Sequence, residues 1–155
     1  MLRQAPGGYA VYKGKMYSAG LPGNTDNVIL KPPEGEPPPG EFVYDPRILP
    51  EPQWRLYLTS EVIEAAWKHK VTAVWHGQRF DVLEVDGDRV YIDVIQPAVP
   101  LEELQRAGLN IDLRDWWAKG WVPFGELEDV VEEDVDQMER LALRRAQRLS
   151  GESLW

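Results

Sequence analysis

The residues best suited to chemistry are carboxylates gathered in the last third of the chain. Eight acids lie within 14 residues that contain no lysine or arginine: Glu126, Glu128, Asp129, Glu132, Glu133, Asp134, Asp136 and Glu139. A carboxylate pair can hydrolyse a glycosidic bond, but one member must be desolvated so that its pKa rises. A helix face this crowded with charge stays solvated, so the run predicts an acidic surface and leaves a glycan-processing enzyme as the weakest alternative.

The other catalytic and metal-binding patterns are missing from the sequence. There is no cysteine, and the two histidines, His69 and His76, do not have the spacing of a metal-binding pair. The sequence contains neither a Gly-x-Ser-x-Gly nucleophile motif nor a phosphate-binding glycine loop. We therefore expect no enzyme activity, no catalytic or cofactor-binding residue and no metal site.

Tryptophan is the second unusual feature, with seven in 155 residues. Trp116 and Trp117 are adjacent, so in most backbone conformations only one of them can face a core. Trp75 and Trp121 lie in apolar, strand-like runs and are expected to be buried. An exposed tryptophan among acids is typical of an interface anchor. The predicted partner-binding residues are Asp115, Trp116, Trp117, Glu128, Asp129, Glu132 and Glu133.

The net charge of −9 is unevenly placed, because residues 1–70 hold 8 basic and 8 acidic side chains, whereas residues 71–155 hold 9 and 18. An acidic surface repels a phosphate backbone, so nucleic acid is a poor partner and a basic protein is a better one. The sequence has no signal-peptide pattern and no run of about 18 apolar residues that could span a bilayer. We expect a cytoplasmic protein that does not bind membranes.

An internal repeat organises the chain. The segment AVYKGKMY at 10–17 returns as AVWHGQRF at 73–80, and DNVIL at 26–30 returns as DRVYI at 88–92. A third pair, LYLTSEVIE from Leu56 and WVPFGELED from Trp121, follows at an offset of 65. The pattern predicts a duplication, with a first repeat at 1–70 and a second at 71–155.

Within each repeat, β-branched and aromatic runs are separated by glycine turns, as in VTAVWHG, QRFDVLEV and RVYIDVI. We predict an α+β fold of two tandem small SH3-like barrels or curled antiparallel sheets, each followed by a helix. The expected helices are 59–70 and a long acidic one at 125–149, with a short helix between Pro100 and Gly108. An apolar stripe is expected on the long helix: Val131, Val135, Met138, Ala142, Ala146 and Leu149. Residues 31–53 hold most of the prolines and read as an insertion without regular structure.

These motifs resemble tandem-repeat immunity proteins that accompany secreted bacterial toxins. That group shows an aromatic-x-V-Y-K-G-K-x-Y opening and an aromatic-V-P-K-S-E-[LV]-E-E-I-Y close, twice over. Here the matching segments are YAVYKGKMY at 9–17, YLTSEVIEAAW at 57–67, TAVWHGQRF at 72–80, LEELQRAGL at 101–109 and GWVPFGELEDV at 120–130. The chain departs from the pattern in the proline-rich insertion, at Phe124-Gly125 and in its C-terminal helix. The resemblance implies a binding protein without shared catalytic residues.

Three functions follow as hypotheses. The first is a cytoplasmic immunity protein that covers the active site of a cognate toxin, whose basic cleft the acidic residues would meet. The second is an SH3-like adaptor for proline-rich peptides. The third is the glycan-processing enzyme.

Overall fold

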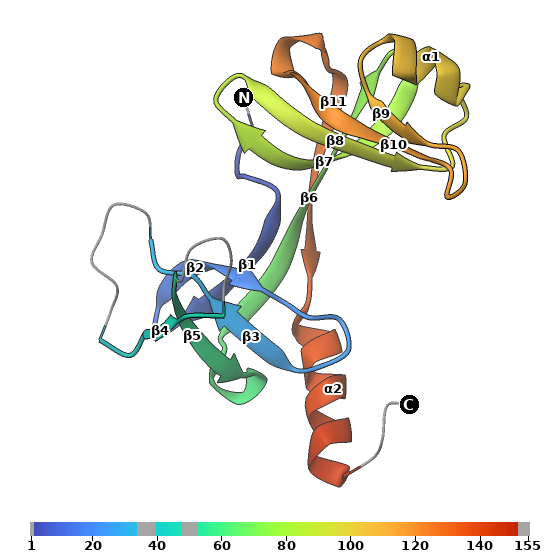
Figure 1. Ribbon diagram of the computed structural model, residues 1–155. Coiled ribbons are helices and arrows are strands. Elements are labelled where there is room, and N and C mark those ends of the chain that lie inside the picture. Colours follow the sequence, from blue (N-terminus) through green and yellow to red (C-terminus); the bar gives the residue numbers. More distant parts are fainter. Residues whose placement is uncertain (1, 34–39, 48–52, 152–155) are drawn as a thin grey trace. The chain divides into compact units, whose positions relative to one another are not determined.

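The structure is a computed structural model that describes residues 2–33, 40–47 and 53–151 (Figure 1). The strands are β1 Gly7–Tyr12, β2 Lys15–Gly20, β3 Asn27–Leu30, β4 Val43–Asp45, β5 Gln53–Thr59, β6 Ala65–Trp75, β7 Gln78–Asp86, β8 Arg89–Ile95, β9 Asn110–Asp112, β10 Trp117–Pro123 and β11 Glu128–Asp136. The helices are α1 Leu101–Arg106 and α2 Met138–Ser150, and short 3-10 turns occur at η1 Ser60–Val62 and η2 Phe124–Glu126.

The prediction of two small barrels or curled sheets is wrong. The described residues form one large open antiparallel sheet of eleven strands, paired in the order β4-β5-β3-β2-β1-β6-β7-β8-β10-β9, with β11 also pairing with β6. The physical reason lies in β6, whose eleven residues contain no glycine or proline that would interrupt the strand. Pairing therefore continues from β1 through β6 to β7 instead of closing on itself.

The chain also divides into two compact units, which we call unit 1 (Met1–Pro6 and His69–Asp134) and unit 2 (Gly7–Lys68 and Val135–Trp155). The order β10-β8-β7-β6-β11 in unit 1 repeats the order β5-β3-β2-β1-β6 of unit 2. In both, a 3-10 turn precedes the last strand, η2 before β11 and η1 before β6. Strand β6 serves both units because it ends one series and begins the other.

The predicted helix at 59–70 is wrong, because these residues form the end of β5, the 3-10 turn η1 and the start of β6. The predicted helix at 125–149 is wrong over its first half, because η2 and β11 precede α2. Acids before bases suit a helix dipole, but Val130, Val131 and Val135 favour a strand, and β6 supplies the backbone partners of β11. The short helix after Pro100 is confirmed as α1, with Gly108 at a φ of 113° just beyond its end.

The predicted apolar stripe is wrong as well, because Val131 and Val135 belong to β11 and not to a helix. Leu149 is 68% exposed, and the buried residue of α2 is instead Leu141. Residues 34–39 and 48–52 of the predicted insertion lie outside the described residues. Between them, β4 pairs with β5, so the expectation of no strand there is wrong, since Val43–Asp45 itself contains no proline.

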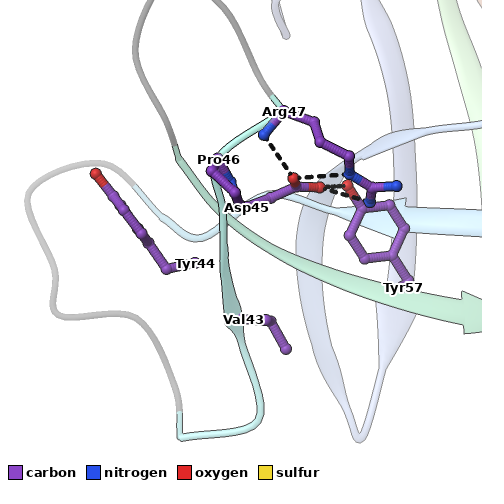
Figure 2. Close-up of a pocket in the computed structure, with 6 residues that line it drawn as sticks. All are labelled: Val43, Tyr44, Asp45, Pro46, Arg47 and Tyr57. Carbon is purple, nitrogen blue, oxygen red and sulfur yellow. Dashed lines mark hydrogen bonds and ion pairs between the residues drawn. The ribbon is translucent and has the colours of Figure 1, made fainter.

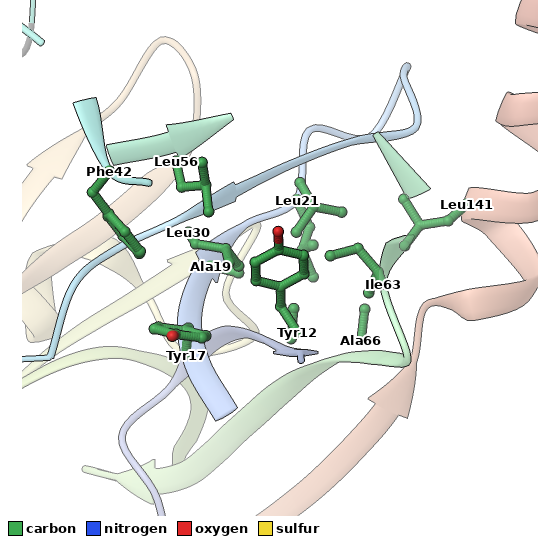
Figure 3. Close-up of a cluster of buried hydrophobic side chains, with 12 residues drawn as sticks. Tyr12, Tyr17, Ala19, Leu21, Leu30, Phe42, Leu56, Ile63, Ala66 and Leu141 are labelled. Carbon is green, nitrogen blue, oxygen red and sulfur yellow. The ribbon is translucent and has the colours of Figure 1, made fainter. Parts of the chain in front are cut away.

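Each unit has its own hydrophobic core. The core of unit 2 gathers Ala10, Tyr12, Tyr17, Ala19, Leu21, Val28, Leu30, Phe42, Leu56, Ile63, Ala66 and Leu141. Figure 3 shows this cluster, which Leu141 reaches from α2. The core of unit 1 is built from the inward residues of β6, β7, β8 and β10 together with Leu101 and Leu104 of α1. The residues that alternate with these inward residues along each strand lie on the opposite face of the sheet.

Candidate binding face

The register of β10 turns Trp121 outward. Trp121 lies opposite Tyr91 of β8, just as Tyr57 of β5 lies opposite Ile29 of β3. Trp121 therefore corresponds to Tyr57 and not to Leu56. The repeat alignment predicted from the sequence is thus displaced by one residue in β10. Because a shift of one residue moves a strand residue to the other face, Trp121 is 39% exposed and its predicted burial is wrong.

The predicted burial of Trp75 is confirmed. Trp75 is 3% exposed, and its indole Nε1 donates a hydrogen bond to Glu126 Oε1 at 3.1 Å. Its ring packs edge to face against Phe80, at a centroid distance of 6.0 Å. The aligned positions Tyr12 and Tyr17 lie in the core of unit 2, so the first repeated motif marks core residues in both units.

An aromatic stripe runs along the outward side of β8 and β10. The Tyr91 and Trp121 rings lie 5.3 Å apart at 64°, and the Arg89 guanidinium lies 5.0 Å from the Trp121 ring centre. Further along β10, Lys119 Nζ lies 4.3 Å from the ring centre of Trp117. Tryptophan, tyrosine and arginine are the residue types that most often dominate protein interfaces.

Carboxylates border this stripe on β7 and β8. Asp81 lies opposite Asp93, and Glu84 lies opposite Tyr91, so the three acids share the outward side with the aromatic rings. None of the three has an ion pair within the described part of the chain. We call this surface the aromatic–acidic face, which consists of Asp81, Glu84, Arg89, Tyr91, Asp93, Trp117, Lys119 and Trp121. It offers a partner apolar area and more acidic than basic side chains, with Lys119 opposite Asp93 in the register.

The predicted partner-binding residues lie in two separate places, around the start of β10 and on β11. Asp115 and Trp116 lie in the turn between β9 and β10, where Trp116 has a φ of 58° and is 47% exposed. Trp117, the first residue of β10, is half-buried. The acids Glu128, Asp129, Glu132 and Glu133 lie on β11, which pairs with β6 and not with β10. The turn with Trp116 and the start of β11 therefore stand at opposite ends of β10, about 20 Å apart along the strand.

Some of the carboxylates of β11 are paired with other side chains of unit 1. His69, whose side chain is fully buried, contacts Asp134 Oδ1 through Nδ1 at 2.6 Å and Glu132 Oε1 through Nε2 at 2.9 Å. The backbone N–H of Arg3 donates to the same Glu132 oxygen at 2.7 Å. Burial lowers the pKa of His69, but hydrogen bonds to the two carboxylates outweigh burial and raise this pKa above its ordinary value. Asp129 is paired with Arg79. These contacts make β11 partly structural.

Unit 2 contains a shallow pocket built around Asp45, which the sequence did not single out (Figure 2). Asp45 accepts hydrogen bonds from the backbone N–H of Arg47 at 2.9 Å, from Arg47 Nε at 3.0 Å and Nη2 at 2.9 Å, and from the Tyr57 hydroxyl. Arg47 first, and then Tyr57, hold the pKa of Asp45 well below its usual range. The carboxylate therefore stays ionised and anchors Arg47 over the Tyr57 ring, 5.7 Å from its centre. The Asp-Pro-Arg sequence, typical of a turn, was the available signal.

The described residues contain neither a metal-binding cluster nor a membrane-spanning helix. No group of three or more histidine, aspartate or glutamate side chains there is placed to hold a metal ion. Neither of the helices that the structure describes is long and apolar enough to cross a membrane. Comparison of the chain with protein-family models, curated proteins and solved structures finds no match.

Proposed function

We propose that this chain is a binding protein that neutralises a secreted toxin domain, and that the aromatic–acidic face of unit 1 is its contact surface. The observation that carries the proposal is the outward position of Trp121 and Tyr91 beside Asp81, Glu84 and Asp93, which have no ion pair within the described residues. The repeated motifs that resemble toxin-immunity proteins supply the biological class.

Each part of the face has a separate task in binding. Burial of Trp121 and Tyr91 against a partner removes a large aromatic area from water, and such residues contribute most of the affinity in protein interfaces. The carboxylates attract a basic partner before contact and raise the association rate. Toxin domains that act on nucleic acids or nucleotides have basic clefts, so an acidic face would both find and cover such a cleft.

The test requires the cognate partner, which we would isolate by pull-down from the native host and by co-expression with toxin domains encoded near the gene. Trp121→Ala should chiefly speed dissociation, with a loss of about 2 kcal/mol or more, equivalent to roughly 30-fold. The triple change Asp81→Asn, Glu84→Gln and Asp93→Asn should instead slow association and weaken its dependence on salt.

Trp116→Ala is the matched control, because Trp116 is also an exposed tryptophan of unit 1 but lies outside the face. Binding by this variant should change little, and thermal melts of all variants would report whether they are folded. Unchanged kinetics in the Trp121 and triple variants would refute the proposed face. A pulled-down partner without toxin activity would refute the proposed function, and selective capture of proline-rich peptides would favour the adaptor alternative.

A further inference from the structure

The outer side of β3, β4 and β5 in unit 2 is an exposed surface equivalent to the aromatic–acidic face. Tyr57, which corresponds to Trp121, is 46% exposed and lies opposite Ile29. Val43 of β4, opposite Arg55, is 60% exposed. Tyr57 and Val43 both line the pocket of Figure 2. Unit 2 therefore repeats the aromatic centre of the face in unit 1.

The charges around this centre are basic. Arg55 is held in place, since its Nη1 donates to the Trp54 carbonyl at 2.8 Å and its Nη2 donates to Gln53 Oε1 at 2.7 Å. Lys31 directly follows β3, and pairing of Leu30 with Leu56 puts Lys31 next to Arg55 in the register. Neither cation has an ion pair within the described residues. Among the described residues, the side therefore presents two positive charges without an ion-pair partner near Tyr57.

The nearby acid does not cancel these charges. Asp45 is 4% exposed, and both of its carboxylate oxygens are engaged by Arg47 and Tyr57. The pair of Asp45 and Arg47 is thus neutral as a whole, while the Arg47 side chain, 78% exposed, covers one side of the Tyr57 ring. Lys31 and Arg55 remain as the net charge. The equivalent surfaces of the two units therefore have opposite signs.

We infer that this side of unit 2, formed by Lys31, Val43, Arg47, Arg55 and Tyr57, is a second docking face whose occupant is an acidic polypeptide segment with apolar side chains. Carboxylates of the segment would meet Lys31 and Arg55, and apolar side chains would cover Val43 and the Tyr57 ring. A guanidinium already fixed by hydrogen bonds loses less conformational entropy on binding. A nucleic acid is disfavoured because its affinity rests on many lysine and arginine contacts to phosphates, whereas the unpaired cations among the described residues of this side are Lys31 and Arg55. The inference does not depend on the proposed function, because it concerns different residues in the other unit.

Titration of the full-length, isotope-labelled chain with a synthetic peptide of alternating glutamate and leucine or tyrosine, followed by NMR, tests the inference. Chemical-shift changes should gather at Val43, Arg55 and Tyr57. A peptide with glutamine in place of glutamate should bind more weakly. The double variant Lys31→Gln, Arg55→Gln should bind the acidic peptide about threefold to tenfold more weakly, because each exposed charge contributes modestly. Both side chains are at the surface, so the spectrum of the variant should remain that of a folded protein.

The matched control removes two cations from the face of unit 1 by the changes Arg89→Gln and Lys119→Gln, and it should leave binding of the acidic peptide unchanged. Equal binding of the glutamate and glutamine peptides would overturn the inference, as would shifts confined to unit 1 or equal affinity of the Lys31, Arg55 variant. Tighter binding of a single-stranded oligonucleotide of equal charge to the same residues would overturn the choice of occupant. Apart from shifts confined to unit 1, none of these results bears on the aromatic–acidic face.

Discussion

Truncation of Leu141 tests how α2 is attached to unit 2. Leu141 is fully buried in the core beside Ile63, and it is the buried residue of α2. The change to alanine removes three carbon atoms, which is about 2.4 kcal/mol at about 0.8 kcal/mol per buried methylene. The cavity left behind raises the typical cost of such changes to about 2.7–5.0 kcal/mol, and the better helix propensity of alanine returns a few tenths. We therefore expect Leu141→Ala to lower the free energy of unfolding by about 2.5–4.5 kcal/mol.

Urea unfolding at constant pH measures this loss, and amide hydrogen exchange at Val28 and Leu30 reports whether it falls on unit 2. Leu149→Ala is the matched control, because Leu149 lies on the same helix but is 68% exposed, so its cost should stay below about 0.5 kcal/mol. The reasoning fails if the two variants lose equal stability or if Leu141→Ala costs less than about 1 kcal/mol. Either result would mean that Leu141 is not the main attachment of α2 to the core.

Two further predictions concern pH and a close backbone approach. The folded pKa of His69 is raised, so the stability that it contributes is present below its unfolded pKa of about 6.5 and is lost as pH rises through the folded pKa. Urea unfolding at about pH 6 and about pH 9 should show a greater loss in the wild type than in His69→Gln, and equal losses would contradict the pairing. A Cβ on Gly8 would collide with the carbonyl oxygen of Ala19, so Gly8→Ala should lower thermal stability by about 1 kcal/mol or more, unlike Gly23→Ala, which meets no atom within 4 Å. Equal melting temperatures for the two glycine variants would show that the strands can separate to admit a methyl group.

Local sequence signals correctly predicted those strands and helices for which the side-chain pattern indicates the same structure as the backbone pairing. The repeated openings at 10–17 and 73–80 became the first strands of two units with the same strand order. Proline before α1 and glycine after it bounded that helix, because each residue restricts or permits a particular φ. The burial of Trp75 followed from its place in the repeat.

The positions of the predicted partner-binding residues could not be derived in the same way. The carboxylates of β11 were expected beside Trp116 and Trp117, but the two sets belong to strands that do not pair with each other. Asp45 and Tyr57 form their hydrogen bond only because β4 and β5 are adjacent. Strands that follow each other in the sequence often pair, but pairings such as β11 with β6 join distant segments, so the positions of these residues required the sheet order.

The sequence by itself determined the duplication signal, the excess of acid in the second half and the existence of most strands, because composition and alternation are local properties. Only the tertiary structure decided that residues 65–70, the first half of β6, and all of β11 are strands, since long-range pairing satisfied backbone groups that the charge pattern alone assigned to helices. It also decided which side of β10 faces outward. An offset of one residue in aligning the repeats was enough to move Trp121 from the expected core to the surface, because side chains alternate along a strand with a period of two.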